Sequence, residues 1–155
     1  MEKTTVVRVL EQQQVPFQVL EYEVDETDLS ATHVAELLGL ESDRVFKTIV
    51  LKGERTGHLV CVVPGTCEID LKRAAKAAGD KSVRPLPLRD LEAVTGYIRG
   101  GCSPLGMKKK FPTYIDETAL VFDTISVSAG RRGLQILIAP RLLAQLSEAV
   151  FCGLI

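Results

Sequence analysis

Lys47 is the residue whose setting points most clearly to chemistry, because it interrupts an apolar run. Residues 45–51 read Val-Phe-Lys-Thr-Ile-Val-Leu, which predicts a strand buried on both faces. Side chains alternate across a strand, so Lys47 shares a face with Ile49 and Leu51, and Thr48 points the other way. An ammonium group among apolar neighbours is costly unless an anion or acceptor meets it. Lys47 is therefore either a site residue or a lysine whose stem packs while its head reaches water.

A glycine-rich loop is the second candidate. Gly100 and Gly101 are adjacent in a segment, residues 96–106, that reads Gly-Tyr-Ile-Arg-Gly-Gly-Cys-Ser-Pro-Leu-Gly. Adjacent glycines let backbone amides approach a ligand closely, and Pro104 restricts the way out of the loop. Three lysines follow at positions 108–110, a local positive cluster. The same pattern also fits an ordinary glycine turn followed by a solvated charged segment.

A third segment, residues 127–134, places Arg131 and Arg132 between two glycines and between two expected strands. Paired arginines are suited to phosphate contacts, and equally to an exposed hairpin. Cys102 is a possible nucleophile. No histidine that could activate it is evident beside it, and small buried cysteines are common.

Composition narrows the classes of function. The chain has 155 residues, 46% of them hydrophobic, and a net charge of −1, which fits one domain over residues 1–155. A nearly neutral protein attracts nucleic acid only through a local patch. No apolar run is long enough for a membrane span, and Met1 to Thr4 lack the apolar stretch of a signal peptide, so we expect a cytoplasmic protein without membrane contact.

Metals and cofactors have no support in the sequence. The four cysteines show no Cys-x-x-Cys spacing, and His33 and His58 are distant from each other, so we expect reduced thiols, no metal site and no site role for either histidine. Neither of the glycine motifs that bind nucleotide phosphates is present, and we expect no cofactor.

Helices and strands interleave along the chain, and these elements must position the candidate residues. Several strands are joined by short turns, which favours an α/β fold with a twisted, largely antiparallel mixed sheet flanked by helices. Strands are expected at 17–24, 45–51, 58–63, 81–86, 113–116, 125–128 and 134–138. Helices are expected at 4–13, 30–39, 70–78, 87–95 and from Pro140 through Val150.

The three candidate segments occur in an order and at distances that resemble those of the YbaK/EbsC family, and the resemblance covers nearly the whole chain. Within that family the chain is most similar to the Cys-tRNA(Pro) deacylases, which are free-standing relatives of the editing domain inserted in bacterial prolyl-tRNA synthetases. The resemblance implies a barrel-like mixed sheet surrounded by helices. It also implies removal of cysteine from mischarged proline tRNA, with prolyl-tRNA synthetase as a partner that supplies tRNA identity.

The resemblance also assigns roles to residues. Lys47 matches the essential lysine of the family, and the loop at Gly100 and Gly101 matches its glycine loop, whose amides would hold the ester carbonyl oxygen. Gln135 stands where some relatives carry an acidic residue, which puts a role for a carboxylate there in doubt. The expected substrate-binding residues are Tyr22, Thr48, Cys102, Ser103, Pro104, Ser128 and Gly130, and the expected contacts to tRNA phosphates are Arg99, Lys108, Lys109, Arg131 and Arg132.

In the mechanism that the resemblance implies, the substrate's own thiol attacks its ester and releases tRNA and a cyclic thiolactone. Three alternatives stay open. The protein could remove alanine or another small amino acid with an activated water, it could bind aminoacyl-tRNA or a synthetase without catalysis, or it could be a thiol hydrolase centred on Cys102.

Overall fold

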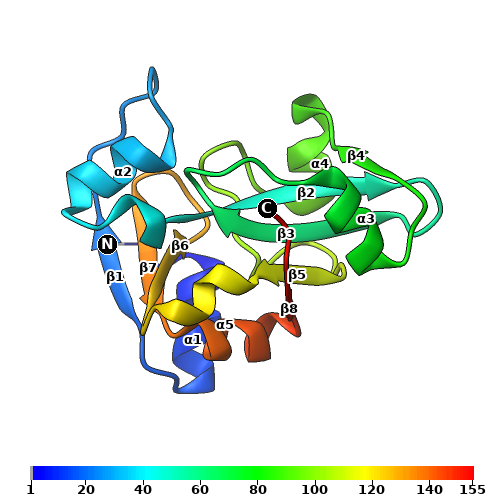
Figure 1. Ribbon diagram of the computed structural model, residues 1–155. Coiled ribbons are helices and arrows are strands. Elements are labelled where there is room, and N and C mark those ends of the chain that lie inside the picture. Colours follow the sequence, from blue (N-terminus) through cyan, green and yellow to red (C-terminus); the bar gives the residue numbers. More distant parts are fainter. Residues whose placement is uncertain (1) are drawn as a thin grey trace.

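Two open sheets form the centre of the structure, which is a computed structural model describing residues 2–155 (Figure 1). The smaller sheet has the strand order β1-β7-β6 and is antiparallel throughout. The larger sheet has the order β4-β2-β3-β5-β8, in which β2 is antiparallel to β3 and β4 while β5 is parallel to β3 and β8. The strands are β1 Gln18–Glu21, β2 Phe46–Gly53, β3 His58–Pro64, β4 Val83–Pro85, β5 Thr113–Asp116, β6 Ile125–Ser128, β7 Leu134–Ile138 and β8 Val150–Cys152.

The expected mixed α/β fold is confirmed, but its barrel-like closure is not. The two sheets are joined by a single isolated parallel bridge between Val45 and Ser126. Within residues 2–155, β4 and β8 remain the outer strands of the larger sheet, and neither pairs with the other sheet. The sheets therefore stay open, and the beginning of β2 lies where they meet.

Helices surround the sheets, and several begin and end where the sequence predicts. Thr4, Ser30 and Asp70 each accept a hydrogen bond from a backbone N–H in the first turn of a helix. No helix within residues 2–155 has the length and apolar character needed to cross a membrane. The helices are α1 Thr5–Gln13, α2 Ala31–Leu38, α3 Leu71–Ala78, α4 Leu91–Thr95 and α5 Pro140–Ser147, with 3-10 turns η1 Ser42–Arg44, η2 Leu88–Asp90 and η3 Glu117–Val121.

The prediction for the C-terminal helix was wrong at its end. α5 stops at Ser147, Glu148 adopts a left-handed conformation with φ 54°, and Val150 begins β8 opposite Tyr114 of β5. Val150 is 58% exposed, so it is an edge-strand residue and not part of the apolar stripe of a helix. Pairing with β5 overrides the weak local preference for helix. The first strand is also shorter than expected, because only Gln18–Glu21 pair with β7.

The two faces of the larger sheet pack differently. On one face of β2, Phe46 and Val50 join the main core with α1, β6 and β7, and we call this the core face. On the other face, Ile49 and Leu51 pack under α3, and we call this the α3 face. Lys47 has the odd-numbered parity of the α3 face and Thr48 the even-numbered parity of the core face.

Candidate functional site

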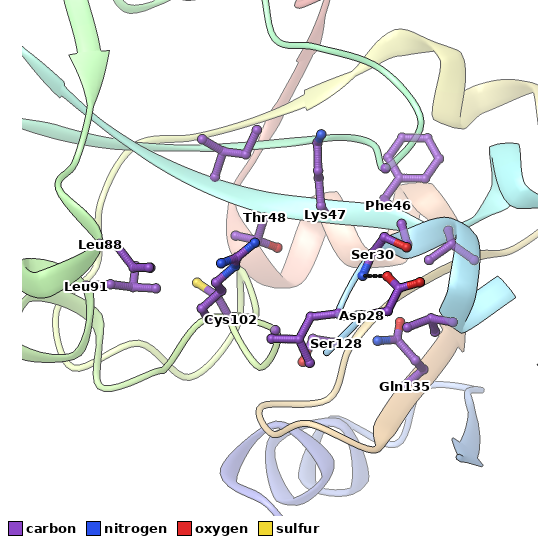
Figure 2. A pocket seen from close by; sticks show the side chains of 18 of the residues that line it. Asp28, Ser30, Phe46, Lys47, Thr48, Leu88, Leu91, Cys102, Ser128 and Gln135 are labelled. Carbon is purple, nitrogen blue, oxygen red and sulfur yellow. Dashed lines mark hydrogen bonds between the residues drawn. The ribbon is translucent and has the colours of Figure 1, made fainter. Parts of the chain in front are cut away.

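A cavity of about 580 Å³ opens along the first half of β2. Its walls come from residues 45–50 at the start of β2, the segment 25–31 that leads into α2, and the segment 85–91 that leads into α4. Arg99, Gly100 and Cys102 line it from the glycine loop. Ser128 and Gln135 complete the lining from β6 and β7. Figure 2 shows Thr48, Cys102, Ser128 and Asp28 on one side of β2, although they come from elements that lie far apart in the sequence, while Lys47 points to the other side.

One edge of β2 is uncovered where it borders the cavity. β4 pairs only with Leu51–Gly53, and the last contact is the Leu86 N–H donating to the Val50 carbonyl at 3.0 Å. Peptide groups alternate in direction along a strand, so the N–H and C=O of Thr48 face the same edge as those of Val50. No strand occupies that edge at Thr48, and these groups are available to a ligand.

Lys47 and Thr48 both border the cavity, but their side chains lie on opposite sides of β2 (Figure 2). Thr48 Oγ1 is buried and has no hydrogen-bond partner within residues 2–155. An unsatisfied buried hydroxyl costs roughly 1–3 kcal/mol, and such groups are rare in folded proteins. Lys47 is half-buried and forms no ion pair with any described residue. The Thr48 hydroxyl and the Lys47 ammonium group are therefore both free to contact a ligand in the cavity.

The glycine loop is held against the Arg131–Arg132 turn. A Cβ on Gly101 would come within 3.0 Å of the Arg131 Cα and 3.2 Å of the Arg132 nitrogen, so a larger residue would have to push the backbone of that turn aside. Arg132 fixes the loop further, because its Nε donates to the Arg99 carbonyl at 2.7 Å. The Gly101 N–H donates to the Ile98 carbonyl at 3.0 Å, so this particular amide is already engaged.

Cys102 and Ser128 face the cavity from below β2 (Figure 2). Burial raises the pKa of the Cys102 thiol to about 12, which keeps it protonated at neutral pH. Ser128 Oγ accepts a hydrogen bond from the Gly130 N–H at 3.1 Å, so its own proton remains free to donate. Tyr22 also borders the cavity, half-buried, from the end of β1.

Other expected site residues lie outside this cavity. Ser103 is buried and accepts from the Leu105 N–H at 3.3 Å, and Pro104 and Lys109 line a separate cavity of about 220 Å³. Lys108 lies over Gly96. The structure thus brings together Tyr22, Lys47, Thr48, Arg99, Gly100, Cys102 and Ser128, and leaves Gly101, Ser103, Pro104, Gly130, Lys108, Lys109, Arg131 and Arg132 outside the lining.

Two lining carboxylates were missed in the sequence. Asp25 and Asp28 border the cavity, and each lies 3.9 Å from a nitrogen of His33. Hydrogen bonds from Thr27 lower the pKa of Asp25, and hydrogen bonds from Ser30 lower that of Asp28. The spacings Asp-x-Thr and Asp-x-Ser predict such local turns, but no sequence signal places them beside β2.

Gln135 is a buried polar residue that lines the cavity. It is 5% exposed, and its Oε1 accepts a hydrogen bond from Ser126 Oγ at 2.9 Å. The side chain is therefore fixed by β6. Within residues 2–155, no three His, Cys, Asp or Glu side chains gather as metal ligands would.

The family described as "Aminoacyl-tRNA editing domain" matches residues 25–146, and the chain belongs to this family. The chain is 53% identical over 150 residues to the "Putative Cys-tRNA(Pro)/Cys-tRNA(Cys) deacylase EbsC" of Enterococcus faecalis, covering 97% of this chain and 92% of that protein. It is also 33% identical over 100 residues to the proline–tRNA ligase of Thermosipho melanesiensis, covering 56% of this chain and 17% of the ligase.

Solved structures share the fold. A crystal structure described as a "putative trans-editing enzyme for prolyl tRNA synthetase" matches with a TM-score of 0.83 at 24% identity, covering 99% of this chain and 98% of that one. A hypothetical protein matches with a TM-score of 0.88 at 20% identity, covering 97% and 99%. The expected family and the expected class, an aminoacyl-tRNA deacylase, are confirmed.

Proposed function

We propose that this protein removes cysteine from mischarged Cys-tRNA(Pro), acting in the cytoplasm as a separate partner of prolyl-tRNA synthetase. The name of the Enterococcus faecalis relative and its 53% identity support cysteine as the amino acid. The likeness to part of a proline–tRNA ligase supports the link to the synthetase. The single observation that carries the proposal is the cavity at Thr48, which offers hydrogen-bonding groups but no activated nucleophile.

The reaction then uses the nucleophile that the substrate brings. The cysteinyl sulfur forms a bond to its own ester carbonyl carbon, the bond to the 3′ oxygen of tRNA breaks, and the thiol proton passes to that oxygen. The products are tRNA and a cyclic thiolactone. The protein has to hold the ester in a bent conformation and stabilise negative charge on the carbonyl oxygen, which are positioning and electrostatic tasks.

The two sides of β2 divide these tasks. The acyl group lies on the core face, where Thr48, Cys102 and Ser128 surround it and Thr48 Oγ1 gains a partner. Lys47, which borders the same cavity from the α3 face, holds the terminal nucleotide through a phosphate or ribose oxygen. Because the Gly101 amide is bonded to Ile98, the carbonyl oxygen is met by the amides of its lining neighbours, Gly100 and Cys102.

The test is deacylation of Cys-tRNA(Pro), Ala-tRNA(Pro) and Ser-tRNA(Pro) by the wild type, by Lys47→Ala and by Lys76→Ala, an exposed lysine on α3 that does not border the cavity. We expect rapid loss of cysteine only, reduced about 100-fold or more by Lys47→Ala and unchanged by Lys76→Ala. Trapping of the thiolactone by an added amine identifies the product.

Each other outcome selects a different function. Faster loss of alanine than of cysteine would assign the protein to a specificity that uses water. Equal rates for the wild type and Lys47→Ala would remove the role given to Lys47. Binding without turnover of any ester would replace catalysis by a binding function.

A further inference from the structure

A row of basic side chains crosses the core face of the larger sheet beyond the cavity. Lys52 of β2 stands directly opposite His58 of β3 and directly opposite Arg84 of β4. All three have the parity of Phe46, Val50 and Val60, which point into the main core. Lys109 lies in the loop before β5, two residues before Phe111, whose ring packs edge-on against His58 with 5.3 Å between the ring centroids. Burial, and then the charges of Lys52 and Lys109, lower the pKa of His58.

The row has no internal compensation. Like charges directly opposite each other on neighbouring strands are destabilising. Lys52, Arg84 and Lys109 form no ion pair within 4.0 Å with any residue of 2–155. Folding alone gives no reason to gather these charges, so an anion outside the chain is the natural partner.

Two acidic residues at this end of the sheet, Glu54 in the β2–β3 turn and Asp80 in the loop after α3, are engaged elsewhere. Asp80 Oδ2 accepts from the Thr56 hydroxyl at 2.6 Å and from the backbone N–H groups of Thr56 and Arg55. Glu54 Oε2 accepts from the Ser82 hydroxyl at 3.3 Å. These contacts direct both carboxylates at the turn itself.

The row continues directly from the cavity. Thr48, Val50 and Lys52 follow one another on the same face of β2, which places Lys52 roughly 13 Å along the strand from Thr48. On the neighbouring strand, Arg84 is two residues before Leu86, which lines the cavity. Val50, between Thr48 and Lys52, is buried in the core, so the row is reached from the cavity past Pro85, which lines the cavity beside Arg84. A chain of phosphates leaving the cavity there would meet the row.

We propose that Lys52, Arg84 and Lys109, with His58 between them, bind the phosphate backbone of the tRNA acceptor end. The occupant rests on the proposed function, since the ester in the cavity is attached to that strand. The contacts are to phosphates and not to bases, so the row sets the direction in which tRNA leaves the site and adds no sequence preference. Arg99, an exposed residue that also lines the cavity, is a further cation available to the same strand.

The test measures binding of uncharged tRNA(Pro) by fluorescence anisotropy over a range of salt concentrations. The variant is Lys52→Ala/Arg84→Ala, and the matched control is Lys72→Ala/Lys76→Ala, which removes two exposed lysines from α3 on the other face. Losing two phosphate contacts should flatten the slope of log K against log[salt] by about 1.4, at about 0.7 per contact for a single strand. The control should keep the wild-type slope.

The outcome separates this inference from the proposed function, because uncharged tRNA carries no ester. An unchanged slope in Lys52→Ala/Arg84→Ala, or an equal loss in the α3 control, would overturn the inference whatever the deacylation assay shows. In the deacylation assay itself, Lys52→Ala/Arg84→Ala should raise KM for Cys-tRNA(Pro) and leave kcat unchanged. Circular dichroism of both variants checks that these surface changes leave the fold intact.

Discussion

The two faces of β2 differ in what covers them, although their residues alternate along one strand. The α3 face is closed from Ile49 onward by a helix and by Leu154, and its one polar group near the cavity is Lys47. The core face opens into the cavity at Thr48 and ends in a row of basic residues at Lys52. The core face is thus buried at Phe46 and Val50 and borders the cavity with a polar group at Thr48, whereas the α3 face is packed at Leu51. Stability and activity should therefore respond separately to changes on the two faces.

The largest expected effect tests the closed face. Leu51 is fully buried beneath α3, so Leu51→Ala should lower the free energy of unfolding by about 2–5 kcal/mol. Activity per folded molecule should stay near wild type, because Leu51 does not border the cavity. Urea unfolding and kcat/KM at low temperature measure the two quantities. A fall in kcat/KM that exceeds the unfolded fraction would mean that the faces are not independent.

A smaller change in the free energy of unfolding, of opposite sign, is expected on the core face. Thr48→Val keeps the shape of the side chain but removes the unpartnered hydroxyl, so it should raise the free energy of unfolding by about 1 kcal/mol. It should also lower kcat/KM about tenfold, since a hydrogen bond to the substrate is worth roughly this much. Thr48→Ser is the control and should keep most of the activity. A Thr48→Val protein that is less stable, or fully active, would contradict the assignment of Thr48 to the substrate.

The smallest effect concerns Asp80, whose carboxylate accepts hydrogen bonds from the turn that follows β2. Hydrogen bonds from Thr56, Arg55 and Lys81 lower the pKa of Asp80 below its usual 3.8. The native state thus binds this proton less readily than the unfolded state, so the contribution to stability is present above pH 3.8 and lost as pH falls below it. Asp80→Asn should lower Tm at pH 7 without changing kcat, and the gap in Tm to the wild type should begin to narrow as the pH falls below 3.8. A gap in Tm that stays constant with pH would show that charge plays no part.

Much of the fold follows from local patterns. The strands 113–116, 125–128 and 134–138 have the predicted bounds, because alternation and turn residues mark both ends. The helix N-caps at Ser30 and Asp70 could also be predicted from the local sequence. Val150 was misassigned because its strand exists only through pairing with β5, which no local pattern encodes.

The sequence predicted less of the candidate site than of the fold. Lys47, Thr48 and the glycine loop were expected as candidates, since a charge in an apolar strand and paired glycines are visible in the sequence. Asp25 and Asp28 and the row at Lys52 were not, because they depend on which strands lie side by side. His58 was expected to have no site role, and its place beside Lys52 and Phe111 becomes apparent only in the folded chain.

The burial of the Cys102 thiol affects how easily the protein could be chemically modified by its own substrate. A substrate that carries both a thiol and an activated ester threatens any thiolate nearby with acylation or with a mixed disulfide. Because burial raises the pKa of Cys102 to about 12, the group that lines the cavity stays protonated and inert toward both reactions. Under the proposed function, Cys102 would therefore be neither acylated nor oxidised by the cysteinyl ester that the cavity encloses.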